Sequence, residues 1–393
     1  MIRATRGGVC AAGGFFCGSV ACGIKDPEES RDDTALLISQ TPCTSAATFT
    51  TNLVKAAPVQ VSMEHLKLGN IRAVILNSGN ANACTGPQGL ADARAMAAAA
   101  AARVGLTLEQ ILVCSTGRIG IPLPISRIET GVANIRLSRR AGLKCAQAIM
   151  TSDTFPKEVS FGVETESGAF RIGGMAKGAG MINPNMATML CVLATDAAIP
   201  QPALRVALRT AVDNSFNRIT VDGDMSTNDT VILLANGASG TAPPLAQFQE
   251  ALDTATKALA RMIVKDGEGV SRLVEVEVQG AASSGDARRA AEAVANSALV
   301  KCAWAGGDPN WGRIMCALGY SGARMIEEKT NLWYGDLPIV QHGVLASTPW
   351  AKLKAVAANE EFRVKIDLSI GEFSHTVWTT DLTEEYVRFN LGE

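Results

Sequence analysis

Short apolar runs bounded by turn residues recur along this chain and predict buried β-strands. Residues 72–77, 111–114 and 231–235 are almost continuously apolar and end in polar or Gly-rich turns, which is typical of core strands with functional groups at their ends. Residues 273–278 instead alternate apolar residues with glutamate, a pattern that predicts a strand with one face towards solvent. The chain therefore contains both fully buried and half-exposed strands.

Three longer stretches have the spacing of amphipathic helices. They cover residues 91–104, 200–212 and 245–264, and the first contains a run of alanines from Ala97 to Ala102. A helix so rich in alanine can pack very closely against a sheet. Strands and helices that alternate in this way predict a mixed α and β fold, in which central sheets are covered by helices.

A loop rich in Gly, Pro and Asn, residues 177–188, runs directly into an apolar segment, residues 189–196, with Thr188 at the junction. A β-branched residue is common at the start of a strand, so one interpretation of Thr188 is purely structural. The other is chemical: a chain that cuts itself before Thr188 frees an amine that can take the proton of the threonine hydroxyl and make it a nucleophile. None of the three histidines lies in a Ser- or Gly-rich setting, so a Ser-His-Asp arrangement has no support.

Composition narrows the choice of partners. A length of 393 residues with 47% hydrophobic residues allows a large core, either as two lobes or as one large layered domain. The formal net charge of −2 gives no broad basic surface for nucleic acid or anionic lipid, and no apolar run is long enough to span a membrane. The ten cysteines include no C-x-x-C pair, which predicts free thiols in a reducing compartment and no zinc site. We therefore expect small-molecule partners.

Several further motifs accompany the junction at Thr188 in a fixed order. They are GIK at 23–25, FTTN at 49–52, NSGNANACTG at 77–86, STGRIG at 115–120, IMTSDT at 149–154, SFNRITVDGD at 215–224, DGEG at 266–269 and GDPNWGR at 307–313. In this order, and over nearly the whole chain, they resemble the family of bifunctional ornithine acetyltransferases and glutamate N-acetyltransferases of arginine biosynthesis.

The resemblance implies a layered helix-sheet-sheet-helix fold and self-cleavage between Ala187 and Thr188. The products would be an α fragment, 1–187, and a β fragment, 188–393, which share one core and assemble as a heterotetramer with two copies of each. The implied activity is acetyl transfer from N-acetylornithine to glutamate through an acetyl-threonine, in the cytoplasm and without a cofactor; acetyl-CoA is a further donor in some members. Two alternatives remain: an autoprocessed amidohydrolase that uses water as acceptor, and a noncatalytic protein that stays uncut.

Matched motif positions imply the remaining roles. Thr116 and Gly117 correspond to the oxyanion-stabilising pair of the family, whereas the local pattern alone also allows an ordinary turn. Substrate binding falls to Thr188 and to four further residues, Thr151, Lys177, Glu268 and Asn390. The spacing of a nucleotide-binding P-loop is missing around Lys177. Asn390 belongs to a segment, residues 386–390, that matches the closing strand of the family.

Overall fold

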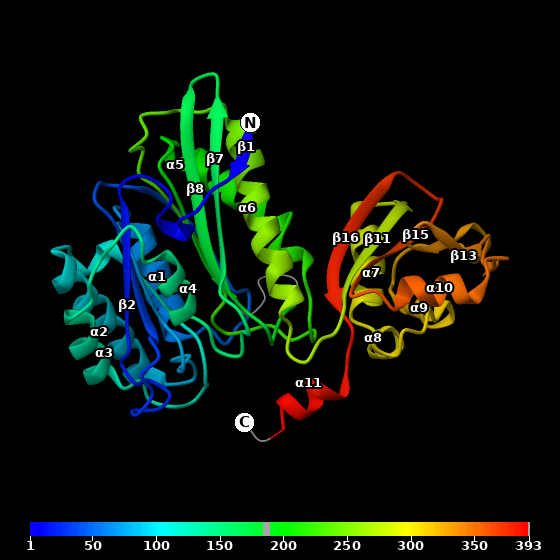
Figure 1. Ribbon diagram of the computed structural model, residues 1–393, viewed down its shortest axis with the longest axis horizontal. Helices are drawn as coiled ribbons and strands as arrows, with labels where there is room; N and C mark the ends of the chain where they lie inside the picture. The colour runs from blue at the N-terminus through cyan, green and yellow to red at the C-terminus, as the bar shows by residue number, and fades with distance from the viewer. Residues whose placement is uncertain (184–188, 392–393) are drawn as a thin grey trace. The chain divides into compact units, whose positions relative to one another are not determined.

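The computed structural model describes residues 1–183 and 189–391, which form two compact units (Figure 1). The first unit comprises Met1–Asn217 and Met225–Ile263, and the second comprises Arg218–Asp224 and Val264–Glu393. Of the two organisations that composition allows, the chain thus adopts the one with two lobes. No helix in the described part of the chain is long and apolar enough to cross a membrane.

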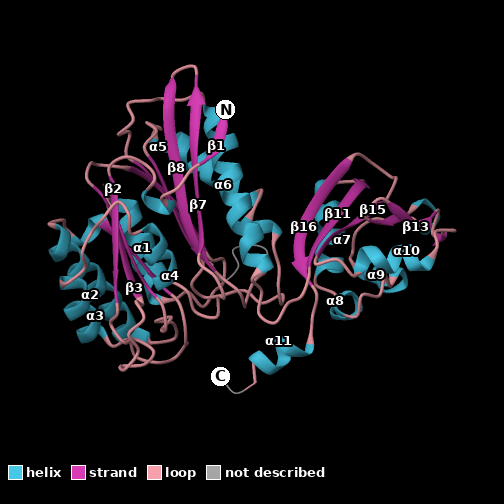
Figure 2. Cartoon of the chain, in the orientation of Figure 1, coloured by secondary structure: helices cyan, strands magenta, loops and turns pink. Residues whose placement is uncertain are grey.

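The first unit contains a six-stranded sheet in the order β1-β7-β8-β9-β10-β4. Figure 2 labels β1, β7 and β8 of this sheet. Its strands are β1 (Ile2–Ala4), β4 (Thr44–Phe49), β7 (Lys157–Thr165), β8 (Gly168–Lys177), β9 (Leu190–Thr195) and β10 (Thr230–Ala235). β9 and β10 run parallel, and the other neighbours are antiparallel. β9 is buried along its whole length, as its apolar sequence predicts. Four of these strands precede Thr188 in the sequence and two follow it, so segments from both sides of that residue share one sheet.

A four-stranded sheet forms the second layer of strands in the first unit, in the order β2-β3-β5-β6. Its strands are β2 (Phe15–Val20), β3 (Thr34–Ser39), β5 (Ala73–Asn77) and β6 (Ile111–Ser115), so the strands predicted at 72–77 and 111–114 are confirmed. β5 and β6 are parallel, and their last residues, Asn77 and Ser115, are register partners. The turns that follow these two strands therefore begin side by side.

The two sheets of the first unit share a core. Successive side chains of a strand point to opposite faces, so Val74 and Leu76 of β5 pack in one cluster with Leu190 and Val192 of β9. Ile75 of β5 belongs to a different cluster, together with residues of the helices on the outer face. Because both faces of β5 are covered by apolar groups, its sequence is continuously apolar.

Helices α2 (Gly86–Val104) and α3 (Ile125–Ala133) cover the outer face of the four-stranded sheet, where the alanines of α2 allow close packing. α2 begins at Gly86, five residues before the predicted start. Pro87 occupies its first turn, where the missing N–H costs nothing. Two shorter helices, α1 (Ala57–Leu68) and α4 (Gly142–Ala148), pack against β6 and β2 respectively.

Helices α5 (Gln201–Asp213) and α6 (Leu245–Lys265) cover the six-stranded sheet and confirm the helices predicted at 200–212 and 245–264. Phe248 of α6 packs on Phe170 of β8, with 6.0 Å between the ring centroids. The first unit therefore has the helix-sheet-sheet-helix layers that the resemblance implies, and the mixed α and β class is confirmed.

The second unit is built on a six-stranded sheet in the order β14-β13-β12-β15-β11-β16. Its strands are β11 (Leu273–Ala281), β12 (Asn331–Tyr334), β13 (Leu337–Gln341), β14 (Val344–Leu345), β15 (Glu361–Asp367) and β16 (Phe373–Thr380). Helices α7 (Ser284–Ala295), α8 (Ala298–Ala305), α9 (Trp311–Tyr320) and α10 (Trp350–Ala357) complete its core. The alternation predicted for β11 is confirmed, because Val274 and Val276 are fully buried whereas Glu275 between them is only half-buried.

The last described element is a helix, α11 (Glu384–Phe389), and not the closing strand expected for residues 386–390. The hydroxyl of Thr383 caps the helix by accepting a hydrogen bond from the Tyr386 N–H at 3.4 Å. Arg388 in the last turn forms ion pairs with Glu384 and Glu385 in the first turn. This distribution of charge suits the helix dipole, and together with the cap it favours a helix over a strand.

Candidate active site

Strands β8 and β9 lead the chain into and out of the segment that holds the predicted nucleophile. Lys177, the last residue of β8, is the antiparallel partner of Leu190, the first residue of β9. Ala187 and Thr188, the predicted cleavage pair, lie outside the described residues. Met189 is described, and its amide nitrogen is bonded to the carbonyl carbon of Thr188. The predicted nucleophile is therefore joined to the chain two residues before the strand partner of Lys177.

Three of the predicted site residues meet at the end of β8. The Nζ atom of Lys177 donates a hydrogen bond to Oγ1 of Thr151 at 2.7 Å, and a longer one to Oγ1 of Thr116 at 3.4 Å. Lys177 and Thr116 are only 3% and 4% exposed, so the ammonium charge lies largely out of contact with water. The fold thus assembles a polar cluster from residues that lie far apart in the sequence.

Gly117 stands where no side chain fits. Its φ of 131° favours glycine, and a Cβ would lie 2.3 Å from the carbonyl carbon of Gly79. The N–H of the preceding Thr116 donates to the Asn77 carbonyl at 3.0 Å, whereas the Gly117 N–H has no hydrogen-bond partner among the described residues. The donors that this turn offers to an oxyanion are therefore the Gly117 N–H and the Thr116 hydroxyl.

Asp153 belongs to the same polar cluster, and sequence reasoning missed it. Its Oδ1 accepts hydrogen bonds from Lys157 Nζ at 2.6 Å and from the Gly178 N–H at 2.8 Å, and its Oδ2 lies 3.8 Å from Lys177 Nζ. Burial alone would raise the pKa of Asp153, but the two ammonium groups and the Gly178 N–H outweigh it and lower the pKa to about 2. Asp153 therefore remains charged and fixes the position of Lys177.

Replacing Asp153 by asparagine is expected to destabilise the protein by about 3–5 kcal/mol, because Lys157 and Lys177 would stay buried without their carboxylate. The wild type should lose this stabilisation as the pH falls from about 4, the usual pKa of the residue, towards 2, since the depressed pKa of Asp153 stabilises the fold only while the group is ionised. Urea denaturation at a series of pH values measures both effects. The control, Glu64→Gln, breaks an exposed pair with Arg94 and should cost less than about 1 kcal/mol; equal losses for the two variants would contradict the assignment.

Asn228 and Asp229 connect the end of β6, directly before Thr116 and Gly117, to the residue before β9, and sequence reasoning missed them too. The Nδ2 atom of Asn228 donates to the carbonyls of Ala81 and Ser115 at 2.7 and 2.8 Å. Oδ1 of Asp229 accepts from the Met189 N–H at 2.9 Å. Burial raises the pKa of Asp229 well above its usual range, although the Met189 N–H and Lys177 oppose that shift. The sequence feature that could have indicated Asp229 is an acidic residue directly before strand β10.

The two remaining predicted residues, Glu268 and Asn390, lie together in the second unit. Nδ2 of Asn390 donates to Oε2 of Glu268 at 3.2 Å. The pairing depends on Gly269, whose φ is 63°, because a Cβ there would lie 2.3 Å from the Tyr386 nitrogen at the start of α11. Asn390 thus orients a carboxylate that is suited to bind an ammonium group.

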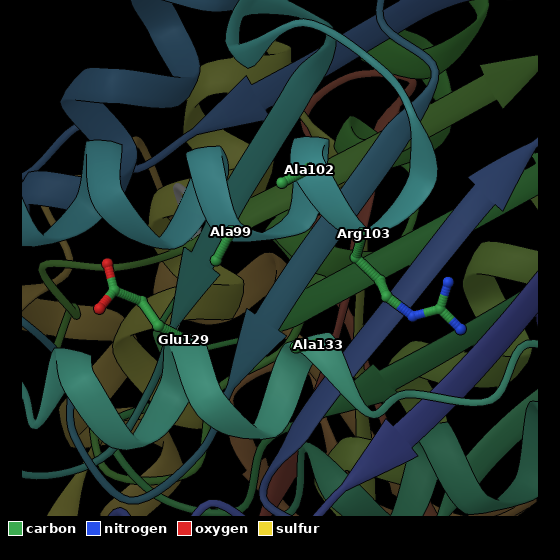
Figure 3. Close-up of a pocket in the computed structure, with 5 residues that line it drawn as sticks. All are labelled: Ala99, Ala102, Arg103, Glu129 and Ala133. Atoms are coloured by element: carbon green, nitrogen blue, oxygen red, sulfur yellow. The ribbon is translucent and has the colours of Figure 1, made fainter.

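A separate hollow of about 460 Å³ lies between α2 and α3, and Figure 3 shows the residues that line it. They are Ala99, Ala102, Arg103, Glu129 and Ala133. Nε of Arg103 already donates to the Ile135 carbonyl at 3.0 Å, and no predicted site residue that the structure describes lines the hollow. We assign it no catalytic role.

Comparison with known proteins decides the family. Residues 16–392 match the profile of the ArgJ family. The chain belongs to the ArgJ family. The arginine biosynthesis bifunctional protein ArgJ of Symbiobacterium thermophilum is 48% identical over 392 residues, which cover 98% of each chain. The protein of the same name from Geobacter sulfurreducens is 49% identical over 388 residues, covering 96% of this chain and 98% of the relative.

Two solved structures are also similar to this ArgJ-family chain. The arginine biosynthesis bifunctional protein ArgJ of Bacillus halodurans is 38% identical, with a TM-score of 0.49, and covers 50% of this chain and 96% of its own. An ornithine acetyltransferase of Mycobacterium tuberculosis, solved with ornithine, is 41% identical, with a TM-score of 0.44, and covers 48% of this chain and 100% of its own. The identification rests on the family profile and the full-length relatives, which confirm the resemblance inferred from the motifs.

Proposed function

We propose that this ArgJ-family chain transfers an acetyl group from N-acetylornithine to glutamate, with Thr188 as the nucleophile. Thr188 attacks the acetyl carbonyl, ornithine leaves with its amine restored, and the amine of glutamate then attacks the acetyl-threonine ester to give N-acetylglutamate. The acetyl-threonine ester divides one difficult amide exchange into two easier steps, which is the advantage of covalent catalysis. Because ornithine leaves before glutamate reacts, ping-pong kinetics are expected. No cofactor takes part, and acetyl-CoA would serve only as a second acetyl donor.

The observation that carries this proposal is the antiparallel pairing of Lys177 with Leu190 beside the polar cluster. Antiparallel partners have Cα atoms only about 4.5–5.5 Å apart, so the backbone of Leu190 lies beside that of Lys177. Thr188 precedes Leu190 by two residues in the sequence, and the cluster at Lys177 contains an ammonium and two hydroxyls, with the Gly117 N–H, unpaired among the described residues, in the turn that follows Thr116. Such a set of donors is suited to stabilise the oxyanion of acyl transfer.

Each proposed role uses a different property of its group. The Gly117 N–H and the Thr116 hydroxyl bind the oxyanion that forms when the acetyl carbonyl is attacked. Lys177, fixed by Thr151 and Asp153, places a positive charge near the acyl group or the carboxylate of the substrate. The freed amine of Thr188 takes the hydroxyl proton during attack and returns a proton to the departing amine.

The same proposal includes self-cleavage and assembly. Cleavage between Ala187 and Thr188 gives fragments 1–187 and 188–393. The pairing of β8 with β9 and of β4 with β10 supports the view that both fragments stay in one core, because each pair joins a strand from one fragment to a strand from the other. A heterotetramer with two copies of each fragment, located in the cytoplasm, completes the proposal.

Intact-mass measurement and N-terminal sequencing test the proposal together with product analysis. The expected result is two fragments, the second beginning Thr188-Met189-Leu190, and transfer of labelled acetyl from N-acetylornithine to glutamate. Acetate release in the absence of any amine acceptor would instead identify an autoprocessed amidohydrolase. A fully active enzyme that consists of one unbroken chain would overturn the proposed nucleophile.

Replacing Glu268 by glutamine is expected to raise the KM for N-acetylornithine by about tenfold or more, because the anion proposed to bind the side-chain ammonium of ornithine is lost. The kcat should change much less, since the group acts equally on the ground state and the transition state. Initial-rate kinetics with each substrate varied in turn measure the effect. The exposed Glu372→Gln variant is the control, and an unchanged KM in Glu268→Gln would remove Glu268 from the binding site.

A further inference from the structure

Asp229 is a buried carboxyl whose two oxygens differ in their hydrogen bonds to the described residues. The residue has no exposed surface, and Oδ1 accepts the Met189 N–H at 2.9 Å. Oδ2 is buried and has no hydrogen-bond partner among the described residues. Burying a carboxylate oxygen without a hydrogen bond costs free energy. A protonated carboxyl carries no charge, and its O–H group can donate a proton. The burial of Asp229 raises its pKa in the direction that favours this protonated form.

The position of Asp229 is fixed from three sides. Its own carbonyl accepts the Thr50 N–H at 2.9 Å, and the carbonyl of Met189 accepts the Thr230 N–H at 3.1 Å. The neighbouring Asn228 is held to the carbonyls of Ala81 and Ser115. Asp229 is therefore held rigidly against the amide nitrogen of Met189, and only three covalent bonds separate that atom from the nitrogen of Thr188.

Self-cleavage before Thr188 requires that the nitrogen of Thr188 receives a proton. When the hydroxyl of Thr188 attacks the carbonyl of Ala187, the carbon–nitrogen bond can break only if the departing nitrogen receives a proton, because an amide anion is a very poor leaving group. In the uncut chain the amine that later serves as the base does not yet exist. Another group must supply the proton.

We propose that Asp229 is the acid that protonates the Thr188 nitrogen during self-cleavage, a role that rests on the cleavage proposed above. The Oδ2–H proton moves to the nitrogen as the bond between Ala187 and Thr188 breaks, and the hydroxyl oxygen of Thr188 forms an ester bond with the carbonyl carbon of Ala187. The proton lost by that hydroxyl restores the acid form of Asp229. Water then hydrolyses the ester, which releases a carboxyl group on Ala187 and the free hydroxyl of Thr188.

The first test follows the uncut full-length chain during cell-free synthesis, in which mass spectrometry measures the rate of cutting. Asp229→Asn keeps the acceptor for the Met189 N–H but cannot transfer a proton, so cutting should slow by about a hundredfold or more. The control is Asp196→Asn, because Asp196 is a buried carboxylate directly after β9 that is bonded to the Gly13 and Arg171 N–H groups. Its rate of cutting should stay near that of the wild type. Wild-type cutting by Asp229→Asn would overturn the inference, whereas a wild type that never cuts would instead refute the proposed function.

Two further readouts separate an acid from a merely structural residue. Hydroxylamine cleaves esters, so it should not restore cutting in Asp229→Asn, where the ester does not form; restored cutting would assign Asp229 to the later hydrolysis and overturn the inference. The rate of the wild type should fall as rising pH ionises Asp229, a readout that stands even if the variant does not fold. Lys177 is the charged group that faces this carboxyl, while Met189 and Thr50 contribute uncharged groups. A rate of cutting that rises with pH would contradict the proposed acid.

Discussion

The Thr188→Ala variant is expected to remain a single chain of 393 residues and to lose acetyl transfer by at least about 10⁴-fold in kcat. Both effects have one cause, since the same hydroxyl is proposed to attack the backbone during maturation and the acetyl group during turnover. The substitution leaves the described cluster of Lys177, Thr151 and Thr116 unchanged in composition. Denaturing gel electrophoresis measures cutting, and transfer of labelled acetyl measures turnover.

Thr188→Ser is the matched control for this variant, because serine keeps the hydroxyl and loses only the methyl group. It should still cut itself and should retain part of the transfer activity. Native-rate acetyl transfer by Thr188→Ala would show that the covalent mechanism is wrong. A variant that is cut but inactive would place the hydroxyl in turnover alone and would separate the two proposed steps.

Gly117→Ala should reduce kcat by about 10²- to 10³-fold, because it removes the geometry of the oxyanion turn. The new Cβ would lie 2.3 Å from the carbonyl carbon of Gly79 and 2.4 Å from the nitrogen of Asn80, so the backbone must shift. That shift would displace the N–H that is unpaired among the described residues. Steady-state kinetics measure the effect, and KM should change much less than kcat, since the interaction forms only with the oxyanion.

Gly120→Ala is the control within the same loop. Gly120 also has a positive φ, of 79°, but a Cβ there meets no heavy atom within 4 Å. It therefore carries the backbone strain of alanine at positive φ without the collision, and its kcat should stay close to the native value. If Gly117→Ala folds and turns over at the native rate, the oxyanion is stabilised elsewhere.

The local pattern of the sequence predicted the elements with the strongest periodicity. Strands β5, β6 and β10 were readable as continuous apolar runs, and α5 and α6 as amphipathic spacing, because burial on defined faces dictates those residue types. The end of the chain was less readable. Residues 386–390 were expected to form a strand, but the Thr383 cap and the ion pairs of Arg388, which act within one or two turns, select the helix α11.

The sequence by itself indicated the family, the layered fold and most of the candidate residues, because these depend on local patterns and on motifs in a fixed order. Tertiary structure alone revealed which charges act on one another. Asp153 lies between two buried ammonium groups, and Asp229 lies against the Met189 N–H, 40 positions away in the sequence. Those contacts arise where strand ends from distant parts of the chain meet in one buried place. Because water is excluded there, each charged group and each oxygen without a hydrogen bond strongly affects the pKa values and the free energy of its neighbours. No local pattern in the sequence encodes that exclusion.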